Sequence, residues 1–318
     1  MIEIIDAPFD LCGRQVGSRL GPMAMRLAGL GTALDSMGVP YTLGGTAVVL
    51  DGERPTDRQD IYDRAVPFYS SLKSKVSDAI KRGNLPLVVG GDHSLSIGSI
   101  SGALNHYPSG LAVLWIDAHM DLNRPVQSPS GNLHGMPLAA LARLTDGGEI
   151  WHRLLHQVVP TPGLTPEGMM WLALRDVDKG EVDNLKELNG ALALTMQDVD
   201  EVGVLGCMNR IFDHLAASGC THLWVSFDVD SLDPVFAPGT GTAVRGGLSY
   251  REGHLIAETL RRMLDRSDAT FELAGLDVVE VNPLQDQRNE TAHVAVEWVS
   301  SLFGKRVLGG LEPGRIER

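Results

Sequence analysis

The chain has 318 residues, of which 43% are hydrophobic and 21% are charged, values that exclude a disordered, collagen-like or coiled-coil protein. Lys and Arg total 27 against 40 Asp and Glu, so the formal net charge is −13. With this balance and no basic run, nucleic acid and anionic membranes are poor candidate partners. Three scattered cysteines fit neither a disulfide framework nor a zinc site. We find no signal peptide and no apolar run of about 18 residues, so we expect a cytoplasmic protein without membrane spans.

Short apolar runs alternate with longer amphipathic segments along the chain. Several runs are continuously apolar, which is typical of parallel strands covered by helices on both faces. In chain order, we predict strands at Ile2–Ile5, Tyr41–Val48, Leu85–Val89, Leu111–Ile116, Met169–Leu174, Ala191–Thr195, Thr221–Phe227 and Leu273–Val279. We predict helices at Pro22–Met37, Thr56–Arg82, Leu95–Asn105, Val199–Ser218, Tyr250–Asp265 and Thr291–Phe303. This alternation favours a three-layer α/β/α fold around a doubly wound, mostly parallel sheet of about eight strands.

Three segments rich in Gly, Pro, Ser or Thr are predicted to be irregular: Asn123–Pro137, Val158–Glu167 and Pro234–Ser249. Loops of this length in a compact protein are usually functional or disordered. Nothing in the composition marks a linker, and no repeat is present. We therefore expect one domain over residues 1–318, with a short polar tail from about residue 305.

Acidic residues and histidines follow three of the predicted strands. Alternate residues of an extended backbone share a face, and ligands of open parallel sheets bind at the carboxyl ends of the strands. One of these strands, Leu85–Val89, is followed by Asp92 and then His93. We expect one crevice to receive four carboxylates and two imidazoles, those of His93, Asp117, His119, Asp121, Asp228 and Asp230.

This combination of side chains predicts a metal site. Taken singly, an Asp after a strand is usually a turn former or a helix cap, and a lone His is usually structural. Four carboxylates cannot share a crevice as anions unless cations neutralise them. Carboxylates with a minority of imidazoles and no thiolate suit Mn²⁺ rather than structural zinc. Six side chains suit two ions, about 3.5–4 Å apart and bridged by shared carboxylates.

Several segments resemble the signatures of the arginase (ureohydrolase) family, and they follow the family's order from about residue 5 to residue 285. The match carries high specificity because the motifs occur together. The segments are Gly17–Arg26 (GxxxGPxAxR), Gly90–Ser94 (GGDHS), Asp117–Asp121 (DAHMD), Ser130–Ala139 (SGNLHGMPLA), Ser226–Pro234 (SFDVDSLDP), Ala237–Gly253 (APGTGTAVRGGLSYREG) and Gly275–Pro283 (GLDVVEVNP).

The resemblance implies hydrolysis of L-arginine to L-ornithine and urea, with a hydroxide between two Mn²⁺ ions attacking the guanidinium carbon. Glu280 would clamp the guanidinium, as suits a planar cation, and His134 would shuttle a proton to the leaving amine. Together with Asp121, these two residues form the expected catalytic set. The resemblance also divides the metal ligands between the ions: Asp117 and Asp228 bridge, His93 and Asp121 complete one site, and His119 and Asp230 complete the other.

Substrate choice is expected to depend on the loop Asn123–His134. The resemblance implies contacts to the α-carboxylate, the α-amino group and the guanidinium end of an amino-acid substrate. Ordinary turn chemistry would explain several of these polar residues equally well. The implied set is Asn123, Ser130 and Asn132 for the carboxylate, Asp178 (with Glu181 through water) for the amino group, and Thr242 and Glu280 for the guanidinium end.

The loop also departs from the family's pattern. Arg124 stands where a small or neutral residue is common, and Val126–Pro129 lacks a threonine-rich stretch. A cation at the rim of the pocket would either attract the substrate carboxylate or crowd it. The alternatives are therefore another guanidino hydrolase, acting on agmatine, guanidinobutyrate or hydroxyarginine, and a catalytically silent binding or regulatory relative. By resemblance we also expect a homotrimer or homohexamer.

Overall fold

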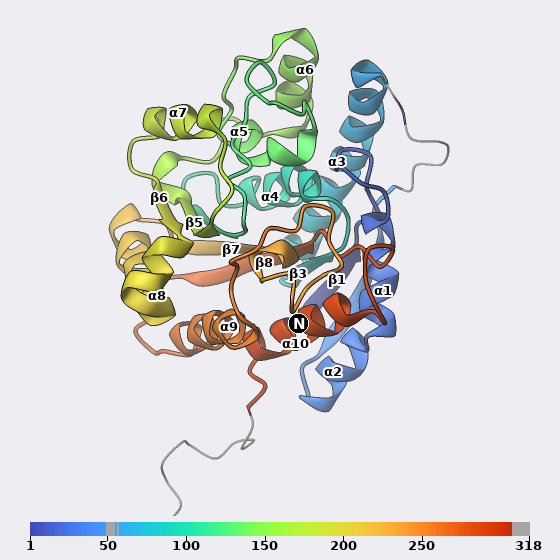
Figure 1. Ribbon diagram of the computed structural model, residues 1–318. Coiled ribbons are helices and arrows are strands. Elements are labelled where there is room, and N and C mark those ends of the chain that lie inside the picture. Colours follow the sequence, from blue (N-terminus) through green and yellow to red (C-terminus); the bar gives the residue numbers. More distant parts are fainter. Residues whose placement is uncertain (49–54, 56, 307–318) are drawn as a thin grey trace, which may run out of the picture.

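The computed structural model describes residues 1–48, 55 and 57–306. Within them, eight parallel strands form one sheet in the order β2-β1-β3-β8-β7-β4-β5-β6 (Figure 1). All eight predicted strands and the mostly parallel sheet are confirmed. The strands are β1 (Ile2–Asp6), β2 (Tyr41–Thr46), β3 (Leu85–Val89), β4 (Leu111–Ile116), β5 (Met169–Leu174), β6 (Leu192–Thr195), β7 (His222–Asp228) and β8 (Glu272–Val279).

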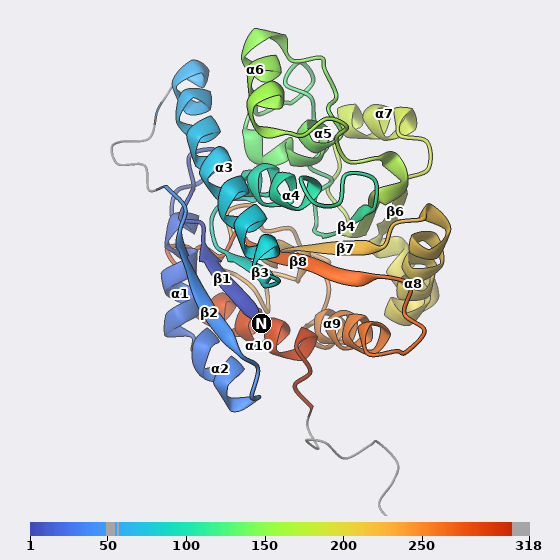
Figure 2. The ribbon, with the colours of Figure 1, turned by 180° about the vertical axis from the view of Figure 1, so that it is seen from behind.

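Helices cover both faces of the sheet, which gives the predicted three-layer α/β/α architecture (Figures 1 and 2). On one face lie α1 (Gly21–Leu27), α2 (Leu30–Ser36), α8 (Met196–Ser218), α9 (Tyr250–Leu264) and α10 (Glu290–Leu302). On the other lie α3 (Arg58–Lys81), α4 (Ser96–Leu104), α5 (Pro137–Leu141), α6 (Gly148–Val158) and α7 (Lys179–Glu187). Among the described residues, no helix combines the length and the apolar character needed to cross a bilayer.

Strand β4 shows why its sequence is apolar throughout. All six of its residues are buried. Val113 and Trp115 belong to the core beneath α3 to α7, whereas Leu114 and Ile116 belong to the opposite core. Because side chains alternate across a strand, each face of the sheet receives half of the residues. A strand buried on both faces therefore reads as a continuous hydrophobic run.

The helices differ from the prediction in several places. The segment predicted as one helix, Pro22–Met37, is two helices, since Gly29 adopts a left-handed φ of 89° between them. Helices α5, α6 and α7 were not predicted. The expected start of α3 at Thr56 and the tail beyond Arg306 lie outside the described residues.

The centre of the sheet brings distant segments to one edge. Strands β3, β8, β7 and β4 are neighbours, and because they are parallel, their carboxyl ends lie together. His93 follows β3, Glu280 follows β8, Asp228 ends β7 and Asp117 follows β4. The topology thereby gathers residues that are up to 187 positions apart in the chain.

Candidate metal centre

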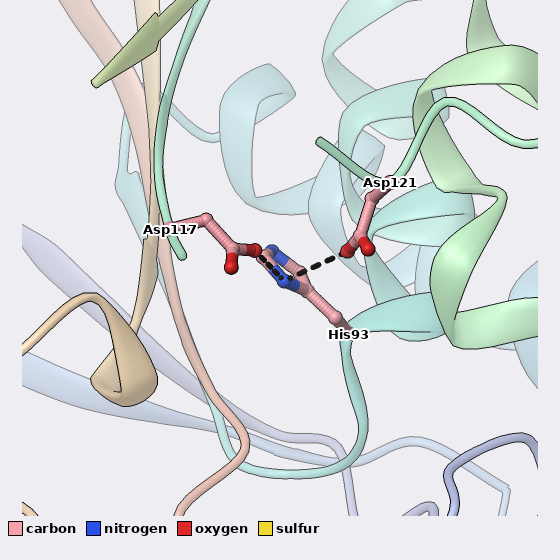
Figure 3. A group of neighbouring side chains, drawn as sticks. All are labelled: His93, Asp117 and Asp121. Atoms are coloured by element: carbon pink, nitrogen blue, oxygen red, sulfur yellow. Dashed lines mark ion pairs between the residues drawn. The ribbon is translucent and has the colours of Figure 1, made fainter. Parts of the chain in front are cut away.

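The imidazole of His93 lies among three carboxylates. Its Nδ1 is 2.9 Å from Asp117 Oδ2, 3.0 Å from Asp228 Oδ2 and 3.3 Å from Asp121 Oδ2; Figure 3 shows it between Asp117 and Asp121. The His93 side chain is buried, and within the described part of the chain its Nδ1 has no well-aligned hydrogen bond. A buried nitrogen crowded by carboxylate oxygens without such a bond is what a metal ligand requires, since a cation would satisfy all four atoms.

A second group of ligand atoms lies beside the first and shares Asp117 with it. His119 Nδ1 is 3.3 Å from Asp117 Oδ1 and 3.2 Å from Asp230 Oδ2. Each oxygen of Asp117 thus faces a different histidine. Asp228 turns only Oδ2 toward His93, because its Oδ1 accepts the backbone N–H of Asp230 at 2.7 Å. The described residues therefore hold two adjacent groups that could each hold an ion.

Bends, rather than extended backbone, bring these ligands together. Strand β4 ends at Ile116, residues 117–119 form a bend, and Asp121 has a left-handed φ of 53°. The predicted alternation along an extended segment is therefore wrong for Asp117, His119 and Asp121. Glu280 is also left-handed, with a φ of 62°. Non-glycine residues in this region carry strain that is typical of functional sites.

Burial and mutual repulsion leave the acidic cluster poorly suited to full ionisation. Burial, followed by the charge of a neighbouring carboxylate, raises the pKa of Asp121, Asp228 and Asp230. Burial acts in the same direction on Asp117, but its contacts with His119 and His93 outweigh this and lower its pKa. A divalent cation would remove this conflict, because it stabilises all the anionic forms together.

Members of both ligand groups, His93, His119, Asp121 and Asp228, line a pocket of about 140 Å³. Most of the predicted substrate residues line it, together with His134, but Asn132 does not. Three lining residues, Ser128, Gly135 and Asp176, were not predicted. Besides the metal-centre residues, the lining includes Asn123, Ser128, Ser130, His134, Asp176, Asp178, Glu181, Thr242 and Glu280.

Glu280 connects the metal centre to His134. Its Oε1 accepts the backbone N–H of His93 at 2.9 Å and lies 3.1 Å from Nδ1 of His134. Burial disfavours the charged imidazole, but the contact with Glu280 prevails and raises the pKa of His134. The backbone N–H of His134 donates to the carbonyl of Cys12 at 3.3 Å, which fixes this loop against the chain's first segment.

The far wall of the pocket is organised by Glu181. Its two carboxylate oxygens accept the backbone N–H groups of Leu122 at 3.0 Å and Asp178 at 2.8 Å, so it joins the loop after Asp121 to the start of α7. Burial raises its pKa to about 7. Asn123 donates from Nδ2 to Asp178 at 2.9 Å, and its buried Oδ1 has no partner among the described residues.

The hydroxyl of Thr242 donates to Asp230 Oδ2 at 2.9 Å. Thr242 also lines the pocket. It therefore holds an oxygen of the His119 group while facing the space that a substrate would fill.

Arg124 does not place a cation at the pocket rim, so that expectation is wrong. The residue is only 7% exposed, and its guanidinium donates to Asp146 at 2.9 Å and also to Glu187. These partners precede α6 and end α7, respectively. Arg124 therefore ties two surface elements together and does not line the pocket.

Sequence reasoning also missed residues that support the ligands from behind. Asp92 accepts the N–H groups of Cys12 and Gly13 at 2.8 and 2.9 Å, which makes it a structural cap of the loop. Ser226 and Asp277 lie behind His93, on β7 and β8. The available signal for Asp277 was a charged residue in the buried, otherwise apolar second half of the strand.

Comparisons with known proteins give a consistent result. The model of the arginase family matches residues 1–304. An arginase from Staphylococcus aureus (strain MSSA476) is 39% identical over 312 residues, which are 96% of this chain and 98% of the relative. The crystal structure of arginase from Bacillus subtilis matches with a TM-score of 0.84 and 37% identity, covering 96% of this chain and 99% of that chain. That of Bacillus caldovelox arginase matches with a TM-score of 0.85, 36% identity and the same coverage. With a sheet, a ligand cluster and a pocket of this kind, the chain belongs to the arginase family.

Proposed function

We propose that the protein hydrolyses L-arginine to L-ornithine and urea with two Mn²⁺ ions. The observation that carries the proposal is Asp117, whose two oxygens face His93 and His119, two histidines that line the pocket. A shared carboxylate between two ligand groups suits a pair of ions rather than one. The arginases that resemble this chain along almost their whole length support the same reaction.

The donor set fits manganese. It consists of carboxylate oxygens with a minority of imidazole nitrogens and contains no thiolate. When bound, two such ions would lower the pKa of water and polarise the guanidinium group. The residues that would hold them are His93, Asp121 and Asp228 in one group and His119 and Asp230 in the other, with Asp117 facing both groups.

Glu280 would bind and orient the guanidinium group. Its carboxylate is buried at the pocket wall, and its Oε1 is fixed by His93 and His134. A planar guanidinium pairs well with a fixed carboxylate through parallel hydrogen bonds. Thr242, held by Asp230, lies at the same end of the pocket and would restrict the orientation of the substrate.

His134 would deliver the proton that the leaving amine of ornithine needs. Its ring is fixed by Glu280, whose charge favours the protonated form. A positioned imidazole with a pKa near the operating pH is an efficient general acid. Glu280 would therefore act on both the substrate and the proton donor, while Asp121 contributes through the ion that it holds.

The opposite end of the pocket would recognise the amino-acid head group. Asn123 and Ser130 would bind the α-carboxylate, and Asp178 would bind the α-amino group, assisted by Glu181 through water. Nδ2 of Asn123 is held by Asp178, while its buried Oδ1 lacks a hydrogen-bond partner in the described residues. Asn132 would act through the loop backbone, because its N–H donates to Ser130 Oγ at 3.2 Å.

Urea release from L-arginine by the Mn²⁺-loaded protein tests the proposal. We expect turnover that requires the metal, and a higher kcat/KM for arginine than for agmatine, since agmatine leaves the head-group contacts unpaired. No urea at any pH after reconstitution would refute catalysis, and faster agmatine turnover would refute the substrate. Metal content well below two ions per chain would favour a silent relative.

We also propose that this chain forms one catalytic domain and assembles as a homotrimer or homohexamer in the cytoplasm. The support for assembly is the resemblance to arginases. Sedimentation equilibrium of the purified protein tests it, and a monomer at micromolar concentration would contradict it.

A further inference from the structure

A chain of buried side chains runs from His93 away from the pocket. His93 Nε2 lies 2.8 Å from Ser226 Oγ, and the Ser226 hydroxyl donates to Asp277 Oδ1. Ser226 and Asp277 are register partners on β7 and β8, and neither is exposed to solvent. Ser226 and Asp277 therefore link His93 to the centre of the sheet. We call His93, Ser226 and Asp277 the relay, and we call the metal site that contains the buried His93 the inner site.

Asp277 is held on its other side by three donors. Its Oδ2 accepts from Ser99 Oγ at 2.7 Å, Trp224 Nε1 at 3.0 Å and Ser96 Oγ at 3.1 Å. Trp224 reaches this position because β8 has a glycine opposite it: a Cβ at Gly275 would lie 2.2 Å from the indole ring. All the donors point at the carboxylate, so Asp277 acts only as an acceptor.

The donor and acceptor roles along the relay follow from this. Because the carboxylate of Asp277 only accepts, the single hydroxyl proton of Ser226 is directed toward Asp277. Ser226 Oγ can then only accept from His93, so Nε2 of His93 carries the ring proton. In the neutral ring, Nδ1 keeps its lone pair, and Nδ1 is the atom that faces Asp117, Asp121 and Asp228.

We propose that Ser226 and Asp277 are positioning residues that fix the tautomer of His93 and thereby set the metal affinity of the inner site. The metal part of this inference rests on the proposed function. When a residue that hydrogen-bonds a ligating histidine is mutated, the metal affinity typically falls by about 10- to 100-fold. Ring stacking of His93 on Trp115, with centroids 3.8 Å apart and planes within 5°, fixes the remaining rotation.

His119, the ligand of the more exposed outer site, has no comparable buried support among the residues that the structure describes. Its Nε2 lies 3.8 Å from Asp176 Oδ2, and the side chain of Asp176 is 67% exposed. The side chain of His119 is itself 23% exposed, against 2% for His93. The two sites therefore differ in how firmly their histidines are oriented, and the relay serves only the inner one.

Asp277→Asn tests the relay with almost no change of shape. Trp224 can only donate, so the new amide must turn its oxygen toward Trp224 and its NH₂ toward Ser226. Ser226 then accepts from that NH₂ and turns its own proton toward His93 Nε2. The ring proton of His93 moves to Nδ1, where it points at the carboxylates and blocks the lone pair.

Two measurements report the outcome. In metal-free protein, ¹⁵N-histidine NMR should show Nε2 of His93 protonated in wild type, since Ser226 accepts from it, and unprotonated (the Nδ1–H tautomer) in Asp277→Asn. In a Mn²⁺ titration followed by EPR of the free ion, the variant should bind one equivalent at least about tenfold more weakly than wild type does. An unchanged tautomer with two equivalents of wild-type affinity would overturn the proposal.

A second variant and a control variant distinguish loss of the relay from a folding defect. Ser226→Ala removes the acceptor for Nε2–H, and it should give mixed tautomers and weaker binding at one site. Ser300→Ala removes an equally buried serine on α10, whose hydroxyl donates to Val296 O at 2.7 Å, and it should change neither readout. If wild type binds no Mn²⁺, the proposed function fails, whereas the tautomer comparison in metal-free protein still decides the relay.

Discussion

Oε1 of Glu280 lies 3.1 Å from Nδ1 of His134. The same oxygen accepts the backbone N–H of His93 at 2.9 Å, so one buried atom connects the proposed proton donor, His134, to the loop that carries a proposed metal ligand, His93. A change at this carboxylate would therefore alter proton transfer and metal geometry together. The roles of the two groups are separated better by changing His134 than by changing Glu280.

His134→Ala should slow turnover by about 10²- to 10⁴-fold, the usual loss when a general acid is removed. Two Mn²⁺ ions should remain bound, because His134 contacts Glu280 and not the ligand carboxylates. Steady-state kinetics and metal analysis of the same preparation measure both effects. His152→Ala, at an exposed position of α6, is the matched control and should match wild type. An unchanged kcat in His134→Ala would remove the assigned role.

Asp121→Ala should deplete one of the two ions and reduce kcat/KM severely. Asp121 lies 3.3 Å from His93 Nδ1, and no backbone group can replace a lost carboxylate ligand. Metal content after desalting gives the stoichiometry, with Asp183→Ala on the exposed face of α7 as the control. Two tightly bound ions in Asp121→Ala would show that this carboxylate is not a ligand.

Glu181 should make the metal-free protein less stable as the pH rises. Its pKa is raised by burial from 4.5 to about 7, so the folded state holds this proton more tightly than the unfolded state does. The contribution of this proton to the free energy of unfolding is fully present below about pH 4.5 and is lost as the pH rises through 7. The pKa shift alone corresponds to a change of about 3 kcal/mol.

Glu181→Gln removes this titration. In urea unfolding with EDTA, the stability of wild type minus that of the variant should therefore fall between pH 5 and pH 8. A difference that stays constant over this range, or rises with pH, would contradict the raised pKa.

Arg124→Met should lower stability by about 1–2 kcal/mol, because a buried guanidinium that pairs with Asp146 and Glu187 is lost. KM for arginine should stay within about twofold of the wild-type value, since Arg124 does not line the pocket. Thermal melts and initial rates measure the two quantities. A large rise in KM would show that Arg124 contributes to substrate binding after all.

The sequence predicted the strands better than the helices, for a physical reason. Strands such as β4 are buried on both faces, so their residues form unbroken apolar runs that are easy to locate. Helix α6 buries Trp151, Leu154 and Val158 on a single face, a pattern that was present in the sequence and was passed over. The split at Gly29 depends on one left-handed residue, which a periodic pattern does not reveal.

The residues of the candidate site were found because the family motifs and the strand ends coincide. Their arrangement was not predictable from those motifs. Arg124 sits next to Asn123 in sequence, yet its ion pairs with Asp146 and Glu187 turn it away from the pocket. Asp277 supports His93 through Ser226 only because β7 and β8 are register partners, which is a property of the sheet.

Because the backbone is left-handed at Asp121 and Glu280, stability and the proposed catalysis favour different residues at these two positions. A glycine would adopt a φ of 53° or 62° without strain, and so it would relieve a cost of about 1–3 kcal/mol. The same exchange would delete a carboxylate that the proposed reaction needs. Random searches for heat-tolerant variants should therefore recover inactive glycine substitutions at these positions, and natural relatives that keep the reaction should have to tolerate the distortion.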